Sequence, residues 1–190
     1  YERAGVAGIQ LEDQVHPKRC GHMEGKEVID AAEMVQKLRA AVDARKDPDF
    51  VIIARTDARA VLGLDEAIRR AKMYVEAGAD VIFVEAPQSR EELARVAGEV
   101  KVPLMANMIE HGKTPLLTAR ELQDLGYKLV VFPLAALYAA AKAVQNCVEA
   151  LMNTGTTESV IPNMLPFHEF NELVGLPQYR EMEAKYRRPS

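Results

Sequence analysis

The stretch FVIIARTD, residues 50–57, decides the fold. Its first five residues are all apolar, three of them β-branched, and it ends on Arg55 and Asp57. An alternating pattern would indicate a strand with one face in water, whereas a continuous apolar run is typical of a parallel strand covered on both faces. The stretch therefore predicts a buried parallel strand with a polar carboxyl end.

Four similar segments occur along the chain, and helical patterns separate them. The other predicted strands are VAGIQLED (6–13), DVIFVEA (80–86), VPLMANM (102–108) and KLVVFPL (128–134). The predicted helices cover 31–45, 64–78, 89–100, 118–126 and 135–155, with Asp30, Ser89 and Thr118 as N-caps. A regular alternation of strand and helix indicates βα units and a parallel sheet, hence an α/β fold.

Two α/β architectures fit this alternation. A doubly wound open sheet usually carries a glycine-rich phosphate loop after a strand, and no such loop is present here. Polar residues at the strand ends instead favour a (β/α)8 TIM barrel, whose active site lies at the carboxyl ends of its strands. A barrel needs eight strands and about 250 residues, whereas the 190-residue chain shows five predicted strands.

We therefore expect an N-terminally truncated fragment of a barrel. Residues 1–157 would supply βα units four to eight, and residues 158–190 a C-terminal helical tail. The tail is amphipathic over 167–187, with a break at 175–177, and either caps the barrel or packs on a neighbouring subunit.

Composition excludes several classes of protein. The net charge of -4 arises without a basic run that contains interleaved aromatic residues, which argues against nucleic-acid binding. No apolar run reaches about 18 residues, the length of a membrane-spanning helix. The two cysteines, Cys20 and Cys147, lie far apart without metal-ligand spacing, which favours the reducing cytoplasm over a disulfide scaffold.

The most unusual segment is HPKRCGHMEGK, residues 16–26, which puts one cysteine among basic residues. Neighbouring cations stabilise a thiolate, and Gly21 and Gly25 allow a loop after a strand end to open and close over a barrel mouth. The alternative is an idle Cys20 with solvated basic neighbours. Cys147 lies in an apolar helical pattern, which predicts core packing.

Other strand ends supply further candidates. Glu12 and Asp13 are either metal ligands, binders of metal-bound water or structural acids. Arg55 and Asp57 share one face of a strand, so the carboxylate either prepares the guanidinium to bind a substrate carboxylate or forms a structural ion pair with it. Glu85 would be costly to bury without a partner. The remaining candidates are Asn107, which can hydrogen-bond a carboxylate, and His111, Lys113 and Thr114 on the following loop.

Some polar residues receive no role. His16 and His168 have no neighbouring ligand partners in the sequence. The charged residues along 66–76 and 90–99 are expected to lie on solvated helix faces.

Five motifs together resemble one family. LEDQ, KRCGH, ARTDA, VEAP and ANMIEHGKTP, in this order, resemble the isocitrate lyase and phosphoenolpyruvate mutase superfamily over essentially the whole chain. KRCGH is the most specific and is similar to the carbon–carbon lyases, because the phosphonate mutases and oxaloacetate decarboxylases depart from it at the cysteine. CGHMEGK and NELVGLPQYREMEAKY resemble the 2,3-dimethylmalate lyase, petal death protein and methylisocitrate lyase branches.

The resemblance implies a cytoplasmic homotetramer that binds Mg²⁺ (or Mn²⁺) and swaps a helix between subunits. It implies that Cys20 is the general acid and that Glu12 contacts the metal through water. The implied gating loop contains Lys18, Arg19, Gly21 and His22, and the implied substrate-binding residues are Arg55, Glu85 and Asn107. The main metal aspartates of the family lie on an earlier strand, which this chain lacks.

The implied activity is Mg²⁺-dependent cleavage of a 2-hydroxy di- or tricarboxylate, of the 2-alkylmalate or methylisocitrate type, into a 2-oxo acid and a second carboxylic acid. One alternative is an oxaloacetate decarboxylase or a phosphonopyruvate- or carboxyphosphonate-type enzyme on the same scaffold. Another is a catalytically inactive barrel subunit. Both activities of the first alternative would leave Cys20 without a role.

Overall fold

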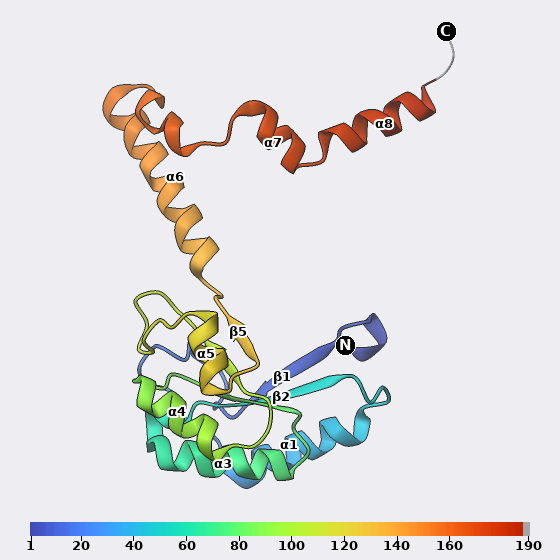
Figure 1. The fold of residues 1–190 in the computed structure, drawn as a ribbon, viewed down its shortest axis with the longest axis vertical. Coiled ribbons are helices and arrows are strands. Elements are labelled where there is room, and N and C mark those ends of the chain that lie inside the picture. Colours follow the sequence, from blue (N-terminus) through green and yellow to red (C-terminus); the bar gives the residue numbers. More distant parts are fainter. Residues whose placement is uncertain (188–190) are drawn as a thin grey trace. The chain divides into compact units, whose positions relative to one another are not determined.

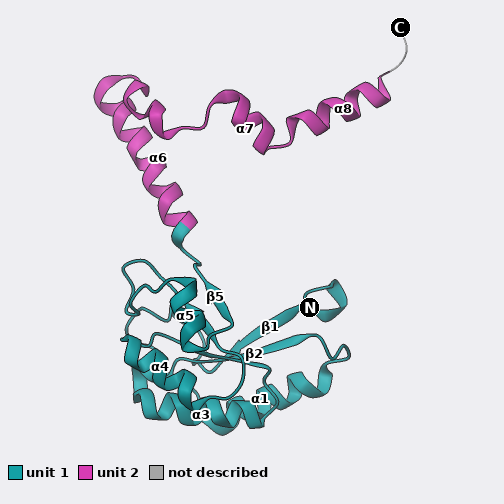
Figure 2. Ribbon diagram, viewed as in Figure 1, with its two compact units in different colours: residues 1–135 teal, residues 136–190 magenta. Residues whose placement is uncertain are grey.

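The computed structural model describes residues 1–187 (Figure 1). The chain forms two compact units, residues 1–135 and the residues from Ala136 onward (Figure 2). The two units divide at the start of a long helix. The sequence predicts a different boundary, after residue 157, which assigns this helix to the βα units. The predicted boundary separates the barrel units from the helical tail, which is not the same as a division into compact units. It stays a prediction.

Unit 1 contains all five predicted strands, each shorter than the apolar run that predicted it. The strands are β1 (Gly8–Glu12), β2 (Val51–Thr56), β3 (Val81–Val84), β4 (Met105–Asn107) and β5 (Leu129–Val131). β1, β2 and β3 pair in parallel in that order, as do β4 and β5. A parallel bridge from Ile82 to Leu104 joins the two groups. The strands therefore follow one another in sequence order.

The helices of unit 1 form a single row. They are α1 (Ala31–Ala44), α2 (Ala58–Leu62), α3 (Leu64–Glu76), α4 (Arg90–Glu99) and α5 (Ala119–Leu125), preceded by a short 3-10 helix, η1 (Glu2–Ala4). α1 packs on α3, α3 on α4, and α4 on α5 (Figure 1). A doubly wound sheet would reverse its strand order and split its helices between two faces. The prediction of an α/β fold with parallel strands is thus confirmed. The five strands in residues 1–187 do not close a barrel, so the truncated barrel stays a prediction.

The two faces of β2 have different neighbours. Ile52 and Ala54, fully buried, belong to the main core between the sheet and the helices, with Met34, Leu38 and Tyr74. Successive side chains of a strand point to opposite faces. On the other face, a smaller apolar cluster contains Val51, Ile53, Val81, Phe83 and Met105. The same alternation puts Arg55 on this second face, beyond Ile53.

The predicted helix caps are present. Asp30 accepts a hydrogen bond from the Ala32 amide, and Ser89 accepts one from the Glu92 amide. Thr118 and Glu121 form a reciprocal capping box. A cap of this kind contributes about 1 kcal/mol, which matters most for a helix as short as α5.

Unit 2 consists of helices. They are α6 (Ala135–Thr154), the 3-10 helix η2 (Glu158–Asn163), α7 (Phe167–Leu173) and α8 (Leu176–Tyr186). The predicted break in the tail is confirmed, because Gly175 has a left-handed conformation with φ 77° and Pro177 follows it. Cys147 is half-buried and α6 buries none of its residues, so the prediction of core packing for Cys147 is wrong within the single chain. In residues 1–187 no helix is both long and apolar enough to cross a bilayer.

Candidate functional site

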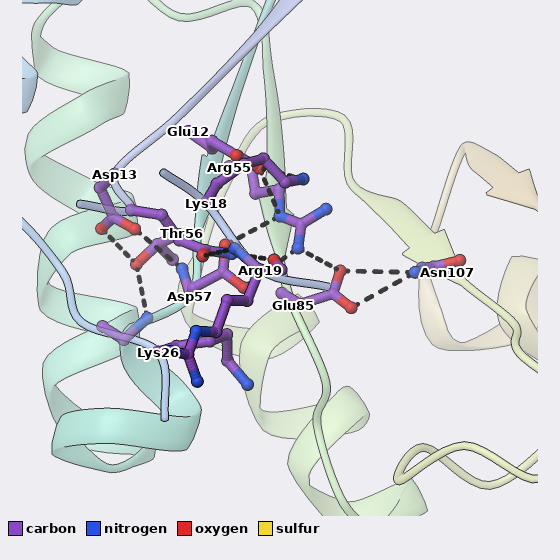
Figure 3. Close-up of polar contacts among 12 residues, drawn as sticks. Glu12, Asp13, Lys18, Arg19, Lys26, Arg55, Thr56, Asp57, Glu85 and Asn107 are labelled. Carbon is purple, nitrogen blue, oxygen red and sulfur yellow. Dashed lines mark hydrogen bonds and ion pairs between the residues drawn. The ribbon is translucent and has the colours of Figure 1, made fainter. Parts of the chain in front are cut away.

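Polar side chains from four strand ends lie together in unit 1 (Figure 3). Glu12 ends β1, Arg55 lies near the end of β2, Glu85 directly follows β3, and Asn107 ends β4. The carboxyl ends of parallel strands meet at one edge of a sheet, and the register pairs Glu12 with Arg55. These residues, predicted separately from the sequence, therefore form one cluster.

Arg55 is at the centre of this cluster. Its Nε and Nη2 atoms donate to the two oxygens of Asp57, at 2.8 and 3.0 Å. Nε also lies 3.4 Å from Glu12 Oε2, and Nη2 lies 3.6 Å from Glu85 Oε2. Burial opposes the charge, but the hydrogen bond to Asp57 and the charges of Glu85, Asp57 and Glu12 outweigh it, so the pKa of Arg55 is raised. The guanidinium is thus charged, 7% exposed and fixed in place.

Glu85 receives side chains from three other segments. It is 1% exposed. Asn107 Nδ2 donates to its two oxygens at 3.3 and 3.4 Å, and His22 Nε2 lies 3.1 Å from Oε1. The His22 contact lacks hydrogen-bond geometry, so we treat it as a close polar contact only. Ala86 follows with φ 55°, an unfavourable conformation for a residue with a side chain. Local backbone strain of this kind is frequent at functional sites.

The basic loop lies directly against Glu85. A Cβ atom added to Gly21 would fall 2.3 Å from Glu85 Oε1, so only glycine fits here without a shift. His22 Nδ1 accepts a hydrogen bond from the Lys113 amide at 2.9 Å, which ties the loop to the segment after β4. Because Nδ1 accepts, the neutral imidazole carries its proton on Nε2, the atom that faces Glu85. The loop therefore contacts both Glu85 and the segment after β4, and we call this position closed.

The other predicted loop residues have separate contacts. Lys18 Nζ lies 3.2 Å from Glu12 Oε2. The backbone of Arg19 exchanges two hydrogen bonds of 2.9 Å with the side chain of Gln14. Cys20 is a free, exposed cysteine between Arg19 and Gly21. The structure thus brings Lys18, Gly21 and His22 to the cluster and leaves Cys20 at the surface of the closed loop.

Lys26 lies at this site although no role was predicted for it from the sequence. It is 8% exposed, and its Nζ atom donates to the Met23 carbonyl. Burial lowers the pKa of Lys26, Lys113 adds to this effect, and the charges of Asp57, Glu85 and Cys20 oppose it. Its position at the end of the basic loop, after Gly25, was the only sequence signal.

Two sequence expectations are corrected here. Asp13 does not face the mouth as a metal ligand: it is fully buried and accepts hydrogen bonds from Thr56, Asp57, Arg70 and Tyr74. Arg70 does not lie on a solvated helix face, because it is 5% exposed and paired with Asp13 at 3.0 Å. The charges of the two residues are balanced inside the protein.

The residues present do not make up a metal site on their own. In residues 1–187 no group of three or more histidine, cysteine or acidic side chains is arranged to hold an ion. Glu12, the predicted contact to a metal, is paired with Lys18 and Arg55. One carboxylate in this setting falls short of the oxygen ligands that Mg²⁺ requires.

Unused hydrogen-bonding capacity gathers where the loop meets the segment after β4. Within residues 1–187, four buried side-chain atoms have no hydrogen-bond partner: His22 Nε2, Asn107 Oδ1, Glu110 Oε2 and Thr114 Oγ1. Buried polar atoms are rarely left unpaired in proteins. Three of the four belong to residues 107–114. This segment is therefore a candidate lining for a polar ligand.

A family model described as phosphoenolpyruvate phosphomutase matches residues 1–152. The chain belongs to this family. The resemblance stated from LEDQ, KRCGH and the later motifs is thereby confirmed at the level of the phosphoenolpyruvate mutase and isocitrate lyase superfamily.

Two of the three relatives described next have lyase names. The chain is 52% identical to 2,3-dimethylmalate lyase of Eubacterium barkeri, over 98% of this chain and 64% of the relative. It is 50% identical to the petal death protein of Dianthus caryophyllus, over 97% and 58%. It is 46% identical to 2-methylisocitrate lyase of Aeropyrum pernix, over 98% and 60%. The chain thus spans about three-fifths of the length of these relatives.

Solved structures of the phosphoenolpyruvate phosphomutase family have the same fold. 2,3-Dimethylmalate lyase in a trigonal crystal form matches with a TM-score of 0.86 and 38% identity, over 98% of this chain and 62% of that one. Oxaloacetate acetylhydrolase with 3,3-difluorooxalacetate matches with 0.86 and 36%, over 96% and 62%. Phosphonopyruvate hydrolase with oxalate and Mg²⁺ matches with 0.80 and 32%, over 98% and 65%.

Proposed function

We propose that the protein is a carbon–carbon lyase that cleaves a 2-hydroxy di- or tricarboxylate of the 2-alkylmalate or methylisocitrate type. The products would be a 2-oxo acid and a second carboxylic acid. The lyase names of its relatives support this reaction. The observation that carries the proposal is the closed basic loop, with Gly21 against Glu85, beside the fixed guanidinium of Arg55.

Arg55 is suited to bind a substrate carboxylate. Asp57 occupies the Nε and Nη2 donors, and in residues 1–187 no side chain or carbonyl accepts from Nη1. A guanidinium that is already oriented loses little entropy when it binds a carboxylate. We assign Arg55, Glu85 and Asn107 to substrate binding, with the unpaired Asn107 Oδ1 free to accept from the substrate.

The proposed reaction is a retro-aldol cleavage followed by a proton transfer. A general base, which we assign to none of the described residues, takes the proton from the 2-hydroxyl. The adjacent carbon–carbon bond then breaks, which yields the 2-oxo acid and a carbanion next to a carboxylate. Arg55 offsets the negative charge that develops. Cys20 then donates its proton to the carbanion after the loop, which also contains Lys18, Arg19, Gly21 and His22, has turned its side chain inward and away from water. The exposed Cys20 must turn inward for this step.

We keep Mg²⁺ or Mn²⁺ as the proposed cofactor, with a water-mediated contact to Glu12. Its support is the Mg²⁺ in the related phosphonopyruvate hydrolase structure. A bound divalent ion stabilises negative charge on substrate oxygens. Because residues 1–187 lack a three-ligand set, most of its ligands would come from outside this chain's described residues.

A panel of substrates tests the proposed function. The whole protein, supplied with Mg²⁺, is assayed with methylisocitrate, isocitrate, 2,3-dimethylmalate and oxaloacetate, and the 2-oxo acid product is measured. We expect turnover with one of the first three compounds. No cleavage of any of them would overturn the proposal.

A second candidate activity comes from two structural neighbours. Oxaloacetate acetylhydrolase and phosphonopyruvate hydrolase have the same fold, which supports hydrolysis or decarboxylation of a 2-oxo acid as the alternative. Turnover of oxaloacetate or phosphonopyruvate, without cleavage of the other compounds, would favour this alternative. Inactivity on every compound, without Mg²⁺ binding in a titration, would identify an inactive barrel subunit.

A further inference from the structure

Asp13 is the most heavily bonded carboxylate of unit 1. It directly follows β1 and is fully buried. Oδ2 accepts from the hydroxyls of Thr56 and Tyr74, at 2.7 and 2.8 Å, and from Arg70 Nη1 at 3.0 Å. Oδ1 accepts from the Asp57 amide at 2.9 Å. A charged group buried at this depth persists only when it is fully paired, as Asp13 is.

We refer to Asp13 and its hydrogen-bond donors as the node. One side of the node contacts the turn next to Arg55, the proposed substrate-binding arginine. The Asp13 carboxylate accepts hydrogen bonds from the Thr56 hydroxyl and the Asp57 amide, which belong to the two residues directly after Arg55. The Asp13 amide also donates to the Arg55 carbonyl at 3.3 Å. Because the Asp57 carboxylate holds both Nε and Nη2 of Arg55, the position of the guanidinium depends on the turn that Asp13 fixes.

The other side leads to the returning end of the basic loop. The Ile29 amide donates to the Asp13 carbonyl at 2.8 Å, and Arg70 Nη1 donates to the Ile29 carbonyl at 2.8 Å. Gln14 and Val28 form an antiparallel bridge, and the Val15 amide donates to the Glu27 carbonyl at 2.9 Å. Main-chain hydrogen bonds thus hold the two ends of the loop next to each other, and the Asp13–Arg70 pair adds a side-chain link to Ile29.

We propose that Asp13, with Arg70 and Tyr74, is a positioning residue that fixes the substrate arginine and the base of the gating loop as one unit. Asp13 does not touch the substrate. It acts through Asp57 on Arg55 and through Ile29 on the loop. The catalytic part of this inference depends on the proposed function, whereas its structural part does not.

The test is Asp13→Asn, with amide hydrogen exchange and steady-state kinetics measured on the same protein. An amide cannot accept three donors at the Oδ2 position, so Thr56, Arg70 and Tyr74 lose their common acceptor. We expect faster exchange at Asp57 and Ile29, at opposite sides of the node. We also expect kcat/KM to fall about 100-fold, as small misplacements of reacting groups do, with kcat lowered as well as KM raised.

Asp80→Asn is the matched control. Asp80 accepts from the Ile52 amide at 2.8 Å and from Arg45 at 2.7 Å, so it also ties an arginine to the backbone of β2, directly before β3 begins. We expect this variant to lose thermal stability and to keep its kcat/KM. Asp13→Asn with unchanged exchange at both amides, or with the kinetics of Asp80→Asn, would refute the proposal.

Tyr74→Phe covers the case in which Asp13→Asn fails to fold. It removes one donor from the node and keeps the buried ring. We expect exchange to change at the same two amides, by a smaller amount, and no change there would refute the proposal. If exchange changes as expected but the wild-type protein cleaves no substrate, the positioning role stands and the proposed function fails.

Discussion

Gly21 has no room for a side chain while the loop is closed. An added Cβ would meet three atoms of Glu85, at 2.3 to 2.4 Å. Glu85 is itself held by Arg55 and Asn107, so it cannot easily give way. We expect Gly21→Ala to keep the loop open and to reduce kcat by at least about tenfold, because closure excludes water and completes the site.

Gly98→Ala is the control for this prediction. Gly98 lies within α4 with no atom within 4 Å of an added Cβ. Alanine at such a position stabilises a helix by about 0.5–1 kcal/mol. We expect a higher Tm and unchanged kcat for Gly98→Ala, against an unchanged Tm and reduced kcat for Gly21→Ala. Full activity of Gly21→Ala would show that closure against Glu85 is dispensable.

Ion pairs between residues that are close in the chain could be predicted from the sequence. Arg55 and Asp57 were expected to pair because residues two apart share a strand face, and they do so at 2.8 and 3.0 Å. Arg70 was wrongly expected on a solvated face because Glu66 and Arg69 form an ion pair near it on α3, whereas its buried partner Asp13 is 57 positions earlier. The periodicity of a sequence indicates which residues share a helix face. It does not indicate which distant carboxylate pairs with a charged residue of that helix.

At the scale of elements, α3 provides a prediction about pH. Glu66 accepts from Arg69 at 2.6 and 2.7 Å and from Arg70 at 2.9 Å. The hydrogen bond from Arg69, then that from Arg70 and the two charges, lower the pKa of Glu66 from 4.5 to about 2. The folded-state pKa lies below the unfolded one, so the stabilisation is complete above pH 4.5 and is lost as the pH falls toward 2.

Glu66→Gln should therefore flatten the stability curve in this window. Because the carboxylate is half-buried at the surface and partly screened by solvent, we expect a loss of only about 0.5 kcal/mol at neutral pH. Urea denaturation at pH 7, 4 and 2.5 measures the free energy of unfolding of both proteins. Glu33→Gln is the control, since Glu33 pairs at the surface of α1 with Lys37 alone. An equal pH dependence in wild type and Glu66→Gln would contradict the prediction.

The secondary-structure elements were largely predictable because their signals are local. Continuous apolar runs marked every strand, and Asp30, Ser89 and Thr118 marked three helix starts. α2 was missed because its five residues, ARAVL, are too short for a period to appear. The predicted strands extend past the ends of the observed strands. The polar residues beyond these ends were included in the prediction, although the pairing of the strands stops before them.

At the scale of the whole molecule, unit 2 bears on assembly. We propose a cytoplasmic homotetramer in which the last barrel helix swaps between subunits. In support, α6, α7 and α8 bury none of their residues in the single chain, and α7 exposes Phe167, Phe170 and Leu173. Large exposed apolar side chains in succession are typical of contact surfaces.

Substitution on α7 tests this assembly. We expect the wild-type protein to be a tetramer by light scattering, and Phe170→Glu with Leu173→Glu to shift it to smaller species. Glu169→Gln changes a charge on the same helix without touching its apolar side chains, and it should leave the tetramer intact. A monomeric wild-type protein would contradict the proposal.

In the proposed reaction, Cys20 donates the proton that completes carbon–carbon cleavage. The direct measurement is kcat of Cys20→Ser in the whole protein, with the best substrate of the panel and Cys147→Ser as the control. A hydroxyl is a much weaker acid than a thiol, so kcat should fall about 100- to 10,000-fold, while Cys147→Ser stays at the wild-type rate. Near-normal turnover of Cys20→Ser would show that Cys20 is not the proton donor.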